Sequence, residues 1–258
     1  MLENSKSKIG KVIAVMSGKG GVGKSSVTSS IAVLLAKRGY QVGILDADLT
    51  GPSIPQMFGM GDEMATGDEN GIYPVESKLG IKVMSVNLLL PNKEEPVIWR
   101  GPIIASVIKQ FFNDVCWGEL DYLLIDMPPG TGDVPLTVYQ TKEAEGSAKS
   151  VVDGVVTVTS PQDLVSMIVK KAYNMAVKME IPIVGFVENF SYMECPDCGR
   201  KIEVFGKSKV KEEVESLGLR LLSQLPIVPD FAQTADEGTF DEFENEHLKD
   251  TVDAVIDL

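Results

Sequence analysis

The sequence predicts an α/β fold, in which a doubly wound and mostly parallel sheet is flanked by helices, and two observations lead to this prediction. Short apolar runs alternate with helical patterns along most of the 258 residues. Each run is apolar at successive positions and rich in β-branched side chains, which is typical of a strand buried on both faces. Strands and helices that alternate in this way build a parallel sheet with helices on both of its faces.

Seven apolar runs are predicted as strands. They are Val12–Met16, Val42–Leu45, Ile81–Val86, Tyr122–Ile125, Val155–Val158, Ile183–Val187 and Leu219–Leu222. Two stripes between them have the spacing of an amphipathic helix. The first stripe is Val27, Ile31, Leu34 and Leu35, and the second is Leu164, Ile168, Ala172, Met175 and Met179. We interpret the methionines of the second stripe as core side chains.

The charge balance argues against two classes of partner. The chain has 24 Lys and Arg against 37 Asp and Glu, a formal net charge of −13. Nucleic-acid backbones and anionic membranes both require clustered basic side chains, so we expect neither as a partner. The segment Asp236–Leu258 alone holds nine acidic residues and one lysine. A solvated helix face is the favoured interpretation of this segment, with a docking surface as the alternative.

Length and cysteine use set further expectations. We expect one domain over residues 1–258, with an acidic C-terminal helix at about 241–258. No apolar run is long enough for a signal-peptide core or a membrane span. Three cysteines, Cys116, Cys195 and Cys198, are too few for a disulfide framework. A reducing cytoplasm is therefore the expected location.

A glycine-rich loop follows the first predicted strand and precedes the first predicted helix. Gly18-Lys19-Gly20-Gly21-Val22-Gly23-Lys24-Ser25 fits the pattern G-x-x-x-x-G-K-[ST]. Glycines let successive backbone N–H groups converge on phosphate oxygens, and the helix adds its N-terminal partial charge. Lys24 is expected between the β- and γ-phosphates, and the Ser25 hydroxyl on Mg²⁺. The alternative is a glycine-rich turn that fits the pattern by chance.

Three carboxylates end strands that neighbour this loop. Asp46 and Asp48 follow the second predicted strand, and Asp126 closes the strand Tyr122–Ile125. In an open parallel sheet the carboxyl ends of the strands face the ligand crevice. Asp126 fits a role in holding Mg²⁺ through water, and Asp48 fits a role in orienting the attacking water, supported by Asp46. Each aspartate taken alone could also be a helix cap or turn residue.

The loop after Asp126 is dense in proline and glycine. Residues 127–133, Met-Pro-Pro-Gly-Thr-Gly-Asp, can neither continue a strand nor begin a helix. A loop of this kind beside a γ-phosphate is expected to change conformation when that phosphate leaves. We therefore interpret it as a nucleotide switch.

A second candidate site lies in the loop 194–199, Glu-Cys-Pro-Asp-Cys-Gly. The spacing C-x-x-C directs two sulfurs, those of Cys195 and Cys198, at one ion. One pair is half a site, and Cys116 and His247 are far away in the sequence. A twofold dimer would supply four thiolates, suited to Zn²⁺ or to an iron–sulfur cluster. A redox dithiol and two unengaged thiols are the alternatives. We expect Cys116 to be a small buried hydrophobe.

These motifs together resemble a known family. The P-loop, with Lys19 near its start, looks like the deviant Walker A motif of the MinD/ParA/nitrogenase-iron-protein class of dimeric P-loop NTPases. Within that class, four further segments closely resemble the Mrp/ApbC family of iron–sulfur cluster carrier ATPases. They are Asp46-Ala47-Asp48 with Gly51-Pro52-Ser53, Trp99-Arg100-Gly101-Pro102, residues 121–133, and Glu188-Asn189-Phe190-Ser191-Tyr192-Met193 leading into the cysteine pair.

The resemblance implies roles for single residues. Lys19 matches the lysine that reaches into the partner's nucleotide site, and Asp48 matches the switch-I aspartate. Gly18 to Ser26 would bind ATP, and Asn189 matches an asparagine that binds the adenine edge. Cys195 and Cys198 match the pair that bridges a [4Fe–4S] cluster between subunits.

The function expected from the resemblance is that of a homodimeric, ATP-dependent carrier that passes the cluster to apo-proteins and hydrolyses ATP slowly. A MinD- or ParA-like spatial regulator is one rival, although the acidic C-terminus argues against it. An ATPase with a purely structural zinc ion and a nitrogenase-reductase-like electron donor are two others. In the electron donor, the cluster cysteines would be expected near the switch loops instead.

Overall fold

The computed structural model describes residues 2–4, 6–48, 51, 53–90, 101–130, 132–141, 149–161 and 165–258. Of the residues named in the motifs above, Pro52, Trp99, Arg100, Thr131 and Leu164 lie outside this description. The side chains of Pro102, Asp133 and Ile168 lie outside it as well.

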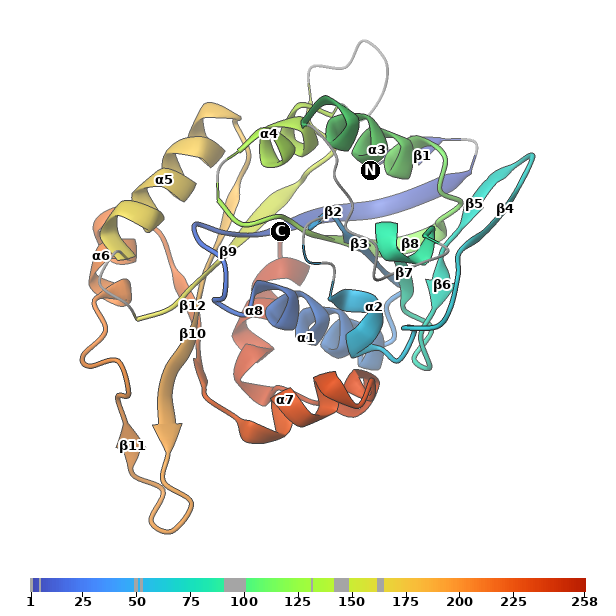
Figure 1. The fold of residues 1–258 in the computed structure, drawn as a ribbon. Helices are drawn as coiled ribbons and strands as arrows, with labels where there is room; N and C mark the ends of the chain where they lie inside the picture. Colours follow the sequence, from blue (N-terminus) through green and yellow to red (C-terminus); the bar gives the residue numbers. More distant parts are fainter. Residues whose placement is uncertain are drawn as a thin grey trace.

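The sheet has a parallel core of seven described strands in the spatial order β12-β10-β9-β2-β8-β3-β7 (Figure 1). Their bounds are β2 Ser7–Ser17, β3 Val42–Asp46, β7 Lys82–Ser85, β8 Gly118–Asp126, β9 Gly154–Thr159, β10 Ile183–Glu194 and β12 Leu221–Pro226. Each of the seven predicted strands overlaps one of these, and the last differs most, since Leu219–Leu222 was predicted and the strand begins at Leu221. Strands that follow β2 in the chain lie on both sides of it in the sheet. In an open parallel sheet, the ligand crevice forms at such a position, outside the carboxyl ends of the strands, and the P-loop follows the carboxyl end of β2.

Short antiparallel pieces complete the sheet. β1 (Leu2–Asn4) pairs with β2, β6 (Val75–Glu76) with β7, and β11 (Lys201–Ile202) with β10. A separate hairpin joins β4 (Thr66–Asp68) to β5 (Gly71–Tyr73). None of these was predicted, because each is only two or three residues long and carries no buried apolar run. The sheet is mostly parallel, as expected.

Helices cover both faces of the sheet (Figure 1). Their bounds are α1 Lys24–Lys37, α2 Ile54–Met57, α3 Gly101–Asn113, α4 Asp133–Gln140, α5 Val165–Lys178, α6 Val210–Ser216, α7 Pro229–Asp236 and α8 Lys249–Ile256, with 3₁₀ turns η1 Val86–Leu88, η2 Phe240–Glu242 and η3 Glu246–Leu248. Side chains of β2 alternate between two cores: Ile13 and Val15 pack with α1 and α8, whereas Val12 and Ala14 pack with α3, α4 and α5. No described helix has the length and apolar character needed to cross a membrane.

The acidic C-terminal segment differs from the single helix expected at about 241–258. It forms two 3₁₀ turns, η2 and η3, before α8 begins at Lys249. Asp241 is buried, and its carboxylate accepts hydrogen bonds from the Ser77 hydroxyl at 2.8 Å and the Lys78 N–H at 3.1 Å. These two bonds reach back to the loop before β7 and favour a local turn over a continuous helix. The segment is thus docked on the body of the molecule and does not only present a solvated face.

An aromatic cluster fixes the position of this segment. Phe240 is fully buried, and its ring packs edge-on against Phe58 and Phe231 with centroid distances of 5.9 and 5.1 Å. The ring of Phe243 lies 5.4 Å away in a tilted arrangement. Edge-to-face pairs of this kind add stability beyond the apolar area they bury. Phe240 therefore links η2 to α2 and α7.

We expect Phe240→Ala to lower the free energy of unfolding by about 3–5 kcal/mol, because it empties a fully enclosed site. Chemical denaturation measures this change. Phe205→Ala is the matched control, since Phe205 is exposed and its truncation is expected to change stability by less than about 0.5 kcal/mol. Equal effects of the two substitutions would contradict the role given to the cluster.

Candidate functional site

The glycine-rich loop joins the end of β2 to the start of α1, as expected. Gly21 and Gly23 have φ of 76° and 77°, a left-handed conformation that glycine adopts without steric cost. A Cβ atom on Gly23 would also collide with the side-chain amide of Asn189. Glycine is therefore required at this position both by the backbone conformation and by the close approach of β10.

A pocket of about 240 Å³ opens in front of this loop. Its walls come from the loop, the start of α1 and the ends of neighbouring segments: Ser17, Gly20, Gly21, Gly23, Lys24, Ser25, Ser26, Asp48, Ser53 and Pro129. Most residues predicted to bind the nucleotide phosphates line it. Gly18, Lys19 and Val22 do not, and Val22 is buried behind the loop. Pro129 brings the predicted switch loop to the edge of the pocket.

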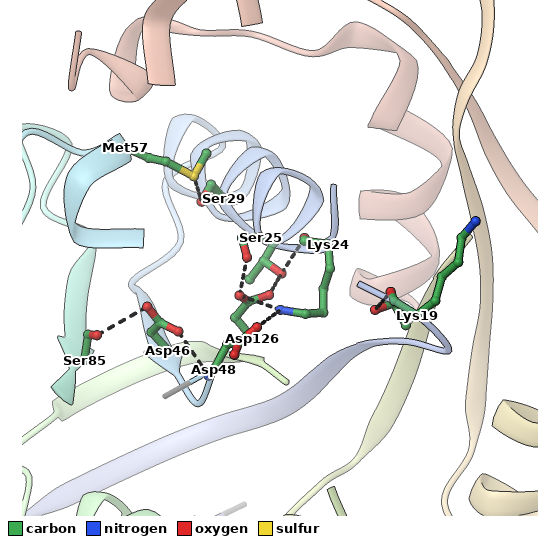
Figure 2. A network of polar contacts seen from close by, with 11 residues as sticks. Lys19, Lys24, Ser25, Ser29, Asp46, Asp48, Met57, Ser85 and Asp126 are labelled. Atoms are coloured by element: carbon green, nitrogen blue, oxygen red, sulfur yellow. Dashed lines mark hydrogen bonds and ion pairs between the residues drawn. The ribbon is translucent and has the colours of Figure 1, made fainter. Parts of the chain in front are cut away.

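Asp126 is the centre of a buried polar network at the end of β8 (Figure 2). The Lys24 ammonium lies 2.7 Å from one carboxylate oxygen, and the Ser25 hydroxyl donates to the same oxygen at 2.6 Å. The Thr28 hydroxyl donates to the other oxygen at 2.8 Å. The Lys24 ammonium thus neutralises one fully buried carboxylate, and two hydroxyls from the first turns of α1 hydrogen-bond to it.

Asp46 lies directly beside Asp126, because the two residues are partners in the register of β3 and β8. Its carboxylate is fully buried and accepts hydrogen bonds from the Asp48 N–H at 3.2 Å and the Ser85 hydroxyl at 3.3 Å. Burial, together with repulsion from Asp126, raises the pKa of Asp46 well above its usual range. Asp46 is therefore suited to a supporting position and not to an exposed catalytic one.

Asp48 and Lys19 take different positions around the pocket. The Asp48 carboxylate lines the pocket and lies 4.0 Å from the Lys24 ammonium. Figure 2 shows the Lys19 side chain extending away from Lys24 and Asp126. The Lys19 backbone carbonyl accepts a hydrogen bond from Ser17 at 2.9 Å, which holds the loop while the side chain points outward.

A second pocket, of about 360 Å³, adjoins the first and shares Ser26 with it. We call it the apolar pocket; it is lined by Ser26, Val27, Ser30, Asn189, Phe190, Leu225, Pro226, Ile227, Val228, Pro229, Phe231, Ala232 and Asn245. Mostly apolar walls with a few polar groups are typical of a site for a flat heterocycle. The residue predicted to contact adenine, Asn189, lies in this wall. Its amide donates to the Val22 carbonyl at 3.0 Å, so it also braces the P-loop.

The cysteine pair lies at the far end of β10, in the turn before β11. Figure 1 shows β10 and β11 extending away from the body of the molecule, with this turn at the tip. The Cys195 N–H donates to the Arg200 carbonyl at 3.0 Å and the Gly199 N–H to the Cys195 carbonyl at 2.8 Å, which closes the turn. Backbone N–H groups of Asp197 and Cys198 lower the pKa of the Cys195 thiol, which favours the thiolate.

The described residues offer this pair no third ligand. Within them, no group of three or more His, Cys, Asp or Glu side chains is arranged to hold a metal ion. The expectation that Cys116 is buried is wrong: its side chain is partly exposed, with its sulfur 3.6 Å from the Asn70 carbonyl. It lies beyond the parallel core because residues 114–116 pair with the β4–β5 hairpin, which was not predicted.

Several residues of the site were missed in the sequence. Thr28 follows Lys24 by four positions, and this spacing, which puts both on one face of α1, was the available signal. Ser30 and Asn245 line the apolar pocket, but they come from α1 and the C-terminal segment. Nothing in the local sequence indicates that these two segments meet.

We expect Asp46→Asn to stabilise the nucleotide-free, metal-free protein relative to wild type more at about pH 7.5 than at about pH 4.5. A raised folded-state pKa means that wild type loses stability as the pH rises from the unfolded-state pKa, about 4, toward the folded-state value. Asparagine cannot titrate and so escapes this loss. Urea denaturation at the two pH values measures the difference.

Asp68→Asn is the control, and its stability difference from wild type should stay nearly constant between about pH 4.5 and pH 7.5, because both values lie above the unfolded-state pKa of about 4. The Asn70 N–H lowers the pKa of the exposed Asp68 carboxylate, so this carboxylate contributes stability above its unfolded-state pKa, which the variant lacks. A stability difference between Asp46→Asn and wild type that does not change with pH would contradict the assigned environment of Asp46.

Comparisons with known proteins show the family to which the chain belongs. A sequence model of the ParA family, described as NUBPL iron-transfer P-loop NTPase, matches residues 8–257. An iron–sulfur cluster carrier protein of Clostridium perfringens is 49% identical over 242 residues, which cover 91% of this chain and 82% of the relative. One from Methanococcus maripaludis is 44% identical over 260 residues, covering 99% of this chain and 88% of the relative.

Solved structures give the same result for the fold. A nucleotide-binding protein from Archaeoglobus fulgidus, in complex with ADP and with Co, matches with a TM-score of 0.81 and 44% identity over 93% of this chain and 91% of its own. The MinD cell division protein of Aquifex aeolicus matches with a TM-score of 0.64 and 19% identity over 96% and 97%, a likeness of fold alone. The fold is therefore that of a P-loop NTPase of the MinD/ParA type, and the chain belongs to the family of iron-transfer P-loop NTPases that includes the iron–sulfur cluster carriers.

Proposed function

We propose that this protein is an ATP-dependent carrier that holds a [4Fe–4S] cluster between two copies of the chain and transfers it to apo-proteins in the cytoplasm. Residues 1–258 would act as one P-loop ATPase domain. The observation that carries the proposal is the pair of neighbouring thiols, Cys195 and Cys198, closed into a turn at the tip of β10 with no third ligand among the described residues. The names of the relatives support the same cargo.

The phosphate groups of ATP would occupy the pocket of about 240 Å³. Backbone N–H groups of residues 18–23 would bind the phosphate oxygens. The Lys24 ammonium would leave Asp126 and bind the β- and γ-phosphates instead. Ser26 lines both pockets, so the nucleotide would extend past it into the apolar pocket, where Asn189 and its neighbours would bind the adenine. The ADP bound to the Archaeoglobus relative supports a nucleotide in this fold.

The donors beside Lys24 fit Mg²⁺. The Ser25 hydroxyl and the Asp126 carboxylate are hard oxygen donors only 2.6 Å apart, which is the ligand chemistry that Mg²⁺ prefers. Ser25 would bind the ion directly and Asp126 through water. When bound, the ion would neutralise charge on the β- and γ-phosphates.

Hydrolysis would depend on positioning and charge. Asp48 lines the phosphate pocket and would orient the attacking water. Lys19, whose side chain extends away from its own Lys24, would complete the partner's site when two copies close on each other (Figure 2). A site that is complete only in the dimer would hydrolyse ATP slowly in a single chain. The rate of hydrolysis would therefore increase when the dimer closes.

Four thiolates, two from each copy, would hold the cluster on the twofold axis. The exposed tip of the β10–β11 arm favours this arrangement, because it can approach its symmetry mate without obstruction from the body (Figure 1). Exposure of Cys198 also leaves the cluster accessible to an acceptor protein.

Anaerobic reconstitution with iron and sulfide, followed by incubation with an apo-acceptor, tests the proposal. We expect about four iron and four sulfide per two chains, absorbance of a [4Fe–4S] cluster, and activation of the acceptor. Uptake of zinc but no iron would instead indicate a structural site and would refute the carrier function.

A substitution in the nucleotide site should impair ATP binding alone, and a substitution in the cysteine site should impair cluster loading alone. We expect Cys195→Ala to abolish cluster loading and leave ATP affinity unchanged. Lys24→Gln should retain the cluster and weaken ATP binding by about 10- to 100-fold, the value of one charge-assisted hydrogen bond. Glutamine is chosen over alanine because it keeps an N–H donor on the side chain that faces the buried Asp126. Titration calorimetry and iron analysis check both variants, and loss of the cluster in a folded Lys24→Gln protein would contradict the separation.

A further inference from the structure

One polar side chain in the apolar pocket has no partner. Ser30 lines the pocket and is 1% exposed, and its hydroxyl makes no hydrogen bond with any residue that the structure describes. Its neighbours on α1 differ. The Thr28 hydroxyl donates to Asp126 and the Ser29 hydroxyl contacts the Met57 sulfur at 3.8 Å.

The missing bond is unusual for a serine inside a helix. Such a hydroxyl ordinarily donates to the carbonyl four residues earlier in the helix. Ser30 does not bond to the corresponding carbonyl of Ser26. A buried hydroxyl without a partner lowers stability, so a group that pairs with it on binding recovers free energy.

The position of Ser30 indicates which part of a ligand it meets. Ser26 borders both pockets, and Ser30 follows it by one helical turn, about 6 Å further from the phosphate loop. The surrounding wall is apolar and includes the rings of Phe190 and Phe231. A flat heterocycle with polar edges fits such a wall, whereas a phosphate group does not.

We infer that Ser30 is a binding residue for the purine base, whose ring edge accepts or donates the hydrogen bond that the Ser30 hydroxyl lacks in the protein alone. The inference rests on the proposed function, since it assumes that the pocket receives the base of ATP. A hydroxyl is both donor and acceptor, so Ser30 strengthens binding of the base without by itself distinguishing adenine from guanine.

Ser30→Ala tests the inference, with ADP and inorganic tripolyphosphate as probes in the presence of Mg²⁺. We expect the variant to bind ADP about 3- to 10-fold more weakly than wild type, the value of one neutral hydrogen bond. Its affinity for tripolyphosphate should be unchanged. The thermal midpoint of the ligand-free variant should equal or exceed that of wild type, because alanine removes an unpaired hydroxyl and favours the helix.

Ser29→Ala is the matched control, because Ser29 is equally buried on the same helix but does not line the pocket. It should leave ADP affinity unchanged. If Ser30→Ala binds ADP as wild type does, or loses ADP and tripolyphosphate equally, the inference fails while the proposed function stands. If wild type itself binds no ADP, the proposed function fails and the inference with it.

Discussion

The buried carboxylate of Asp126 is the group on which two parts of the structure depend: the carboxyl ends of the inner strands β8 and β3, and the pocket of about 240 Å³ in front of the P-loop. It ends β8 in register with a second buried carboxylate, Asp46, at the end of β3. Two adjacent carboxylates in a parallel sheet are tolerated only where donors compensate them. Lys24, Ser25 and Thr28 supply these donors from a single helix, so the position of α1 is set by electrostatics as well as by apolar packing.

The position of α1 in turn determines the two pockets. Lys24 and Ser25 line the first pocket from the first turn of α1, Ser26 borders both pockets, and Ser30 lines the apolar pocket one turn later. Removing one partner of a buried ion pair typically costs about 3–5 kcal/mol, because the remaining charge is left without compensation. A ligand that draws Lys24 away from Asp126 must therefore bring its own charge, which a nucleotide with a divalent cation does.

Strand β10 connects this region to the cysteine turn. Near its middle, Glu188 is fully buried and bonds to Ser191, Ser208 and Gln224. The next residue, Asn189, donates to the P-loop at Val22. The strand then runs on to Glu194, immediately before Cys195. Strand β10 thus contributes Asn189 and Phe190 to the apolar pocket and leads directly into the cysteine turn. Under the proposed function, it would give a change at the P-loop a short structural connection to the cluster.

The parallel core and the phosphate site could be predicted because their signals are local. A strand buried on both faces is an uninterrupted apolar run, and a phosphate loop is a short glycine pattern between a strand and a helix. The β10–β11 arm could not be predicted in full, since β11 has only two residues and both are exposed. The residues of the apolar pocket could be predicted only in part, because Ser30 and Asn245 are 215 positions apart and only tertiary packing brings them together. The C-terminal helix was predicted too long because a contact with Ser77, not local propensity, determines the turn at Asp241.

Under the proposed function, a second copy of this chain completes the cluster site at Cys195 and Cys198. Native mass spectrometry of the anaerobically reconstituted protein tests it most directly, because it counts chains and cluster atoms in the same particle. We expect one [4Fe–4S] cluster in a particle of two chains, and single chains without a cluster when Cys195 and Cys198 are both replaced. A cluster carried by a single chain would refute a site shared between two copies.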